Sequence, residues 1–202
     1  MKVNYSKNSD YHTQRNNKNI PGDTCNVTAA VMAIKQAGWT VPERKGIQPE
    51  DALWDVLRTA ESYDYQKRAA RWSVGWYPPE QVHTCLEWGI NKWMGQEIDE
   101  FHERATKDQI YDHLKAKGGV VLSGNFPLDR GELGHIVSVA GWVGIDTVDE
   151  VVRWIIDDPY GNWNEQYSDI RGNDTLISAD DFDRIFLRSG HLWAHLVRPY
   201  AA

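Results

Sequence analysis

The first half of the chain carries the hydrophobic spacing of amphipathic helices. Apolar residues recur every three to four positions, which is the period of an α-helix. This spacing predicts helices over four segments, residues 24–38, about 49–60, 79–88 and 106–118. Gly38, Gly89 and Gly118 are predicted to end three of them, because glycine readily adopts the left-handed conformation common at helix ends. Thr106 and Gln109 form a capping-box pattern that predicts where the last helix begins.

After residue 118 the pattern changes to short runs of β-branched and aromatic residues, which are typical of strands. These runs predict strands over residues 120–122, 135–143, 151–157 and 192–197, with one more helix between residues 178 and 190. Residues 144–150 are predicted to join two of the strands as a hairpin loop. Helices followed by an antiparallel sheet predict an α+β fold.

Composition narrows the class of protein. The 202 residues suit one domain, residues 1–202, with a polar N-terminal arm over about residues 1–12. The net charge of -7 argues against a nucleic-acid partner, which would need a basic face. No run of 18 apolar residues occurs, so we expect no membrane insertion. The polar residues 1–6 predict no signal peptide, and we therefore expect synthesis in the cytoplasm.

Cys25 and His135 are the first candidates for chemistry. Cys25 stands at the start of a predicted helix, where unpaired backbone N–H groups and the helix dipole favour a thiolate. His135 follows Gly134 at the mouth of a predicted strand, which is a rigid and partly exposed position. Taken singly, each has an ordinary role, as a small core residue and as a surface histidine. Together they suggest a nucleophile and its base.

An acid can reach this histidine through the predicted hairpin. Asp157 and Asp158 end the strand that follows the loop. If Val143 lies near Val151, antiparallel pairing places His135 opposite the end of that strand. The alternation of side chains does not decide between the two aspartates, because the register of the loop is unknown. Either acid would complete a Cys–His–Asp arrangement for amide-bond hydrolysis.

Three motifs resemble those of the C39-like, papain-like cysteine peptidases of bacteria and their phages. They are the segments Gln14-Arg-Asn-Asn with Thr24-Cys-Asn-Val-Thr-Ala-Ala-Val-Met, Gly134-His-Ile-Val-Ser-Val-Ala-Gly, and Asp158-Pro-Tyr-Gly-Asn, and the resemblance extends over about residues 11–197. It implies a papain-like fold in which the nucleophile helix packs on a C-terminal antiparallel sheet. It also implies a role for each site residue. Cys25 would be the nucleophile, His135 the base and Gln14 an oxyanion donor, and Asp158 is preferred over Asp157 because the acid of the family precedes proline.

The resemblance also implies a substrate class. We expect a peptidoglycan endopeptidase of the lysin type that cleaves bacterial cell-wall peptides as a monomer, with no cofactor and no metal. Such a lysin would reach the wall by holin-type export or from a virion. The alternatives are a peptidase acting on proteins or propeptides, and a catalytically silent binding module of the same fold. Candidate substrate contacts are Trp76, Trp163 and Asn26, and residues 46–93 are the segment that would shape the substrate groove.

Three other polar groups have simpler interpretations. His191 and His195 have the spacing of a helical metal pair, but their segment is predicted to be a strand, which makes zinc improbable. His83 and Glu87 are expected to be a surface pair on a helix, and Cys85 on the same helix is expected to pack in the core.

Overall fold

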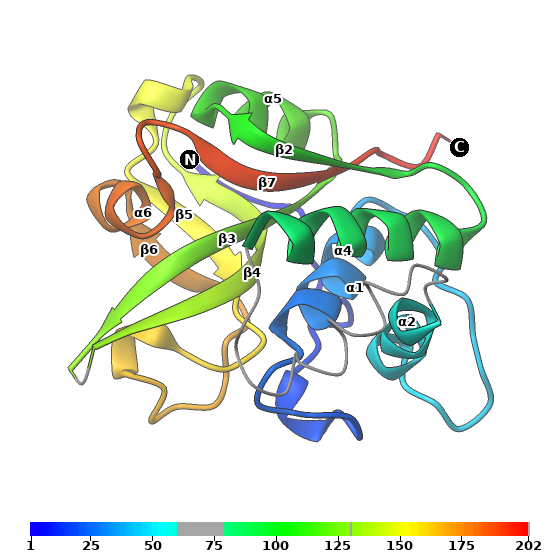
Figure 1. Ribbon diagram of the computed structural model, residues 1–202. Helices are drawn as coiled ribbons and strands as arrows, with labels where there is room; N and C mark the ends of the chain where they lie inside the picture. The colour runs from blue at the N-terminus through cyan, green and yellow to red at the C-terminus, as the bar shows by residue number, and fades with distance from the viewer. Residues whose placement is uncertain (60–78, 130, 202) are drawn as a thin grey trace.

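Alternating side chains on an extended sheet separate the molecule into layers. The computed structural model describes residues 1–59, 79–129 and 131–201. Within these residues seven strands form one antiparallel sheet in the order β2-β7-β3-β4-β5-β6, and β1 pairs with β4 outside this path. Figure 1 shows α1, α2 and α4 beside one face of the sheet and α6 beside the other, with α5 near one edge. The α+β fold that the sequence predicts is confirmed.

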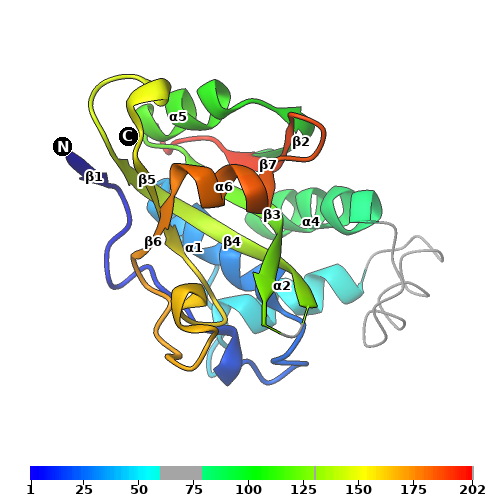
Figure 2. The same cartoon turned by 90° about the vertical axis from the view of Figure 1, so that its left-hand side faces the viewer.

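The sequence pattern predicts the bounds of the strands only in part. Their bounds are β1 Lys2–Asn4, β2 Asp99–Ala105, β3 Gly119–Leu128, β4 Gly131–Val143, β5 Arg153–Asp157, β6 Thr175–Ser178 and β7 Leu192–Val197. β5 and β7 closely match the predicted strands. β3 and β4 are longer than predicted and form a hairpin that projects from the sheet (Figure 2). β1, β2 and β6 were not expected from the sequence.

The helices include all those predicted. Their bounds are α1 Cys25–Gln36, α2 Pro49–Arg58, α4 Pro79–Met94, α5 Lys107–Lys115 and α6 Ala179–Phe186, with short 3-10 turns η1 Gln14–Asn16, η3 Val148–Glu150 and η4 Trp163–Glu165. α5 begins with the predicted capping box, in which Thr106 and Gln109 bond each other's backbone N–H groups. The predicted end of α4 at Gly89 is wrong, since the helix continues to Met94.

Two cores lie on opposite faces of the sheet. Val121 of β3 packs with α1, α2 and α4, whereas its neighbours Val120 and Leu122 pack with α5 and α6. This is the period-two alternation of a strand covered on both faces. All three side chains are fully buried, so the central strand that supports the site is rigidly held.

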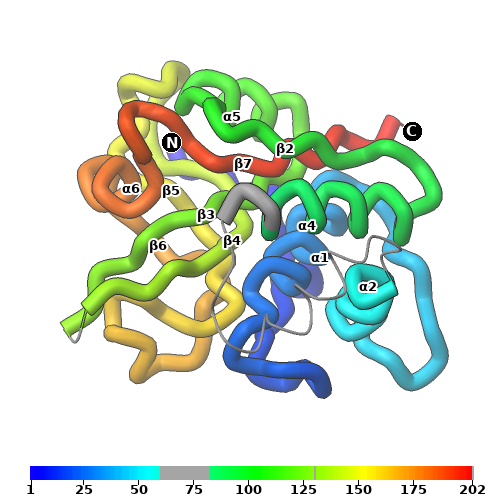
Figure 3. Tube along the Cα trace, in the orientation of Figure 1, coloured from blue at the N-terminus to red at the C-terminus, as the bar shows by residue number. Residues whose placement is uncertain are grey.

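The polar N-terminal arm is tied to the rest of the fold. Residues 2–4 pair with residues 141–143 of β4, and the phenolic hydroxyl of Tyr11 donates to the carbonyl of Asp158 (3.1 Å). Figure 3 follows this blue segment from the sheet to the loops that precede α1. The arm therefore contacts Asp158, one of the two candidate acids.

Candidate active site

Cys25 is the first residue of α1 and is half-buried. The hydroxyl of Thr24 does not cap the helix and instead accepts a hydrogen bond from Nδ2 of Asn17 (2.9 Å). The first turn thus keeps N–H groups that favour a negative charge at the sulfur. The position that the helical pattern predicted for Cys25 is the one that the structure shows.

His135 lies on β4 and is almost fully buried. Its Nε2 lies 2.7 Å from Oδ1 of Asp158, and the side chain of Cys25 lies close enough to the ring to raise its pKa. Burial alone would lower the pKa of His135, but the charge and hydrogen bond of Asp158, together with Cys25, raise it to about 10. The imidazole is therefore held between a sulfur and a carboxylate, in surroundings that favour the imidazolium form.

Asp158 is fully buried, and its carboxylate accepts more hydrogen bonds than that of the adjacent Asp157. Oδ1 accepts from His135 and from the backbone N–H of Tyr160 (2.8 Å), and Oδ2 accepts from the hydroxyl of Tyr167 (3.2 Å). Burial, followed by the charge of Asp158, raises the pKa of Tyr167 above its ordinary value. Tyr167 therefore stays a neutral donor that fixes the carboxylate.

Asp157 points away from the histidine. Its carboxylate accepts hydrogen bonds from the hydroxyl of Ser6 (2.6 Å) and the backbone N–H of Asp174 (2.9 Å). Burial raises its pKa to about 6, although these two hydrogen bonds oppose the change. Val143 does lie near Val151, since the N–H of the adjacent Val152 donates to the carbonyl of Val143 (2.9 Å), but the residue paired with Val143 is Arg153 and the register shifts between residues 139 and 141. The structure nevertheless brings Asp158 to His135.

Gln14 lies in η1 beside the same site and is buried. Its backbone N–H donates to the carbonyl of Pro159 (3.0 Å), and its Nε2 donates to the carbonyl of Pro21 (2.8 Å). These two bonds dock the polar arm on the turn that follows Asp158. An amide nitrogen carries two hydrogens, so Nε2 keeps one for a ligand.

One cavity of about 620 Å³ connects these groups. Its lining includes side chains from the helical and the sheet parts, namely Gln14, Cys25, Asn26, His83, Ser123, Asn125, His135, Tyr160, Tyr167 and Arg188. Asn26 is buried, and within the described part of the chain neither polar atom of its amide has a hydrogen-bond partner. A buried amide without a partner is costly, so Asn26 is available to a bound ligand. The predicted contact residue of the helical motif, Asn26, thus lies where a substrate contact is possible.

The two tryptophans proposed for substrate contact differ in outcome. Trp163 is buried against Phe126, and its Nε1 donates to the carbonyl of Pro127 (3.0 Å). It belongs to the core below the sheet and is not among the residues that line the cavity, so the structure corrects its predicted role. Trp76 lies outside the described residues.

His191, His195 and His83 lie in different surroundings. His195 is buried in β7, whereas His191 precedes that strand and contacts Arg104 (2.9 Å). Four residues of strand span about 13 Å, too far for both imidazoles to bind one ion. No group of three potential metal ligands occurs among the described residues. The predicted surface pair of His83 and Glu87 is wrong, since His83 is buried, while Cys85 packs against the helical core as expected.

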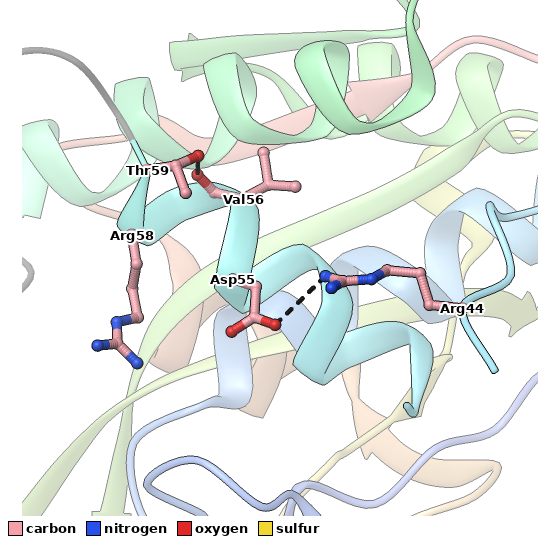
Figure 4. A pocket seen from close by; sticks show the side chains of 5 residues that line it. All are labelled: Arg44, Asp55, Val56, Arg58 and Thr59. Carbon is pink, nitrogen blue, oxygen red and sulfur yellow. Dashed lines mark hydrogen bonds and ion pairs between the residues drawn. The ribbon is translucent and has the colours of Figure 1, made fainter. Parts of the chain in front are cut away.

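A second hollow lies beside α2, away from the cysteine. Figure 4 shows its lining residues, Arg44, Asp55, Val56, Arg58 and Thr59, and the ion pair between Arg44 and Asp55 (3.3 Å). Both partners are half exposed, so water screens the pair strongly. The residues drawn include no cysteine or histidine, whereas Cys25 and His135 both line the other cavity.

Comparison with known proteins gives one match that covers most of the chain. Residues 6–184 match the family described as Peptidase_C39 like family. The chain matches no curated protein. Within the described residues no helix has both the length and the apolar character needed to cross a membrane.

Proposed function

The chain belongs to the Peptidase_C39 like family, and from this premise we propose that it is a cysteine peptidase that hydrolyses amide bonds through an acyl-thioester on Cys25. The observation that carries the proposal is that His135 shares the lining of one cavity with Cys25 and bonds the buried Asp158. A catalytically silent module would have no need of these groups together.

The first half of the proposed reaction forms the acyl-thioester. In the resting state His135 already holds the proton of the Cys25 thiol, as an imidazolium–thiolate pair, and the thiolate attacks the carbonyl carbon of the scissile amide. The backbone N–H of Cys25 and the remaining hydrogen of Gln14 Nε2 stabilise the oxyanion of the tetrahedral intermediate. The carbon–nitrogen bond then breaks, and His135 returns the proton to the leaving amine.

The second half releases the acid. His135 takes a proton from water, the hydroxide attacks the thioester carbon, and the carbon–sulfur bond breaks. The thiolate leaves beside the imidazolium of His135, which restores the ion pair of the starting state and releases the carboxylic acid. Asp158 keeps the imidazole in one orientation throughout, and Tyr167 keeps Asp158 in place.

For the substrate we propose the stem or cross-bridge peptide of the bacterial cell wall. The support is the resemblance of the three motifs to the bacterial and phage type of peptidase. Asn26 would bind the main chain of this peptide, because its unpaired amide can both donate and accept beside the nucleophile. A protein or propeptide substrate is the alternative within the same chemistry.

Digestion of purified bacterial walls tests both the proposed peptidase activity and the proposed cell-wall substrate. We expect the wild-type chain to release new amino and carboxyl termini that mass spectrometry assigns to one peptide bond, and we expect Cys25→Ala to release none. Unfolded protein substrates incubated in parallel test the alternative. Cleavage of proteins but not of walls would overturn the cell-wall substrate, and cleavage of neither would overturn the peptidase.

A further inference from the structure

Residues 11–15, at the end of the polar N-terminal arm, cover the turn that carries Asp158. The backbone carbonyls of three successive turn residues, 158–160, each accept a hydrogen bond from this segment. The bonded groups are the hydroxyl of Tyr11 with Asp158 (3.1 Å), the backbone N–H of Gln14 with Pro159 (3.0 Å) and Nε of Arg15 with Tyr160 (2.6 Å). The mechanism proposed above gives no role to Tyr11.

The hydroxyl of Tyr11 joins two segments of the chain. It donates to the carbonyl of Asp158 and accepts from the backbone N–H of Gly172 (3.1 Å), which uses both the donor and an acceptor of a phenol. The backbone N–H of Asp158 donates in turn to the carbonyl of Gly172 (2.9 Å). A Cβ atom at position 172 would lie 1.9 Å from the carbonyl oxygen of Asp158, so the two backbones are in direct contact. Tyr11 therefore closes the base of the loop between residues 158 and 172.

The ring of Tyr11 packs on the helical part of the molecule. It is half-buried and lies against the hydrophobic core of α1, α2 and α4, which Cys25 also borders. Burial raises the pKa of Tyr11 above its ordinary value, so the hydroxyl keeps the proton that it donates. One side chain thus connects the part that carries the thiol with the loop that carries the acid.

The backbone position of Asp158 decides where its carboxylate lies. The carboxylate is bonded to His135, to the backbone N–H of Tyr160 and to the hydroxyl of Tyr167. An aspartate side chain is short, so a movement of the turn is carried almost directly to these oxygens. A hydrogen bond weakens steeply when its geometry worsens. A displaced turn would therefore loosen the 2.7 Å contact between Asp158 and Nε2 of His135.

We propose that Tyr11 is a positioning residue whose hydroxyl fixes the backbone of Asp158 and so keeps the carboxylate against His135. The inference rests on the proposed function only in taking Cys25 and His135 as the reacting pair. Tyr11 touches neither of these two groups and acts through Asp158. Loss of the hydroxyl should therefore make the imidazolium of His135 less stable and leave a smaller fraction of Cys25 ionised.

A purely structural role is the competing account, because the same hydroxyl ties the arm to the fold. Ser6 offers a matched control, since its hydroxyl anchors the arm at a second point by donating to Asp157 (2.6 Å). Ser6→Ala loosens the arm and leaves the bonds of Asp158 in place, whereas Tyr11→Phe keeps the ring and removes the bond to Asp158. If Tyr11 is only a tether, the two variants should have similar effects.

The test measures the reactivity of Cys25 without a substrate. Peptide mapping gives the rate constant of its alkylation by iodoacetamide at about pH 6, where a thiolate stabilised by the imidazolium of His135 reacts and an ordinary thiol is slow. No oxyanion forms in this reaction, so a displaced Gln14 does not affect it. We expect Tyr11→Phe to lower the rate constant about threefold to tenfold, the worth of one neutral hydrogen bond. Ser6→Ala should change it by less than about twofold.

The same substitution in a second background shows whether Tyr11 acts through the acid. In the Asp158→Asn chain no carboxylate remains to be positioned, so Tyr11→Phe should change the alkylation rate by less than about twofold. A structural role predicts the same loss in both backgrounds, because it does not depend on the charge of residue 158. Thermal unfolding of all the chains shows that each is folded at the temperature of the assay.

Other results would overturn the inference. These are an unchanged rate in Tyr11→Phe, an equal loss in Ser6→Ala, or the same loss from Tyr11→Phe in the Asp158→Asn background. A Tyr11→Phe chain that does not fold would also contradict it, because the hydroxyl would then hold the fold rather than the acid. Failure here leaves cleavage by Cys25 untouched, whereas failure of the proposed function appears in the wall and protein digests.

Discussion

Asp157 and Asp158 are neighbours in sequence, both fully buried, and yet bonded to different parts of the molecule. Asp158 accepts from His135 and Tyr167, while Asp157 accepts from Ser6 in the N-terminal arm. The first carboxylate orients the imidazole of His135, and the second anchors the N-terminal arm. A sequence pattern with period two cannot separate them without the register, and the bulge in β4 changes that register.

Substituting each acid by its amide should separate the two roles. We expect Asp158→Asn to lower kcat by about 10²–10⁴, because the imidazole loses the charge that stabilises its protonated form and fixes its tautomer. Asp157→Asn should leave kcat within a few-fold, since its carboxylate is remote from the imidazole. Steady-state kinetics on a cleaved peptide measure both, with thermal unfolding as the control for folding. A larger loss in Asp157→Asn would contradict the assignment of Asp158.

At the scale of elements, a glycine in a helical pattern can either end the helix or allow another helix to pack closely against it. Only the structure distinguishes the two cases. Gly118 follows α5 as predicted, but Gly89 lies inside α4. A Cβ atom at position 89 would lie 2.0 Å from Cδ2 of the buried Leu57 on α2. The glycine is therefore required for the close approach of two helices, which residue spacing within one helix cannot reveal.

The prediction of strands from sequence is limited in the same way, because a strand can lack a local hydrophobic pattern. β2 contains five charged or histidine side chains among its seven residues, so it has no apolar alternation to read. It pairs with β7 at the edge of the sheet, where charged residues are common because they discourage pairing with other chains. The buried strands, rich in β-branched residues, were predictable because burial itself selects those side chains.

Enlarging Gly89 tests this account of the helix packing. Gly89→Val should lower the free energy of unfolding by roughly 1–3 kcal/mol, because overpacking forces α2 and α4 apart. The double variant with Leu57→Ala should recover part of this loss. Lys92→Val, on the exposed face of the same helix, is the matched control and should change stability by less than about 0.5 kcal/mol. Urea unfolding measures all four proteins, and a Gly89→Val chain as stable as the control would contradict the packing argument.

At the scale of the whole molecule, the site is assembled from four separate parts of the chain. Cys25 comes from α1, His135 from β4, Asp158 from the turn after β5 and Gln14 from the arm. The helix and strand patterns pointed to Cys25, His135 and one of two adjacent aspartates, whereas Gln14 and the choice of Asp158 came from the resemblance to the family. Tyr167 and Tyr11 were not assigned their contacts, because their partners are defined only when the sheet forms.

This assembly makes the cysteine depend on the sheet for its reactivity. Cys85 provides an internal comparison, because it is also half-buried but lies within a helix rather than at its start. An ordinary thiol, with a pKa of about 8.5, is almost fully protonated at pH 6 and reacts slowly with electrophiles. A thiolate paired with the imidazolium of His135 should react at that pH.

Site-resolved alkylation is the measurement that tests the central claim most directly. The native chain is treated with iodoacetamide at about pH 6, and peptide mapping by mass spectrometry follows each cysteine over time. The account predicts that Cys25 is labelled well before Cys85, and that His135→Ala removes this preference in a chain that still folds. Equal labelling of both cysteines, preference for Cys85, or a Cys25 rate unchanged by His135→Ala would contradict a Cys25–His135 nucleophile pair.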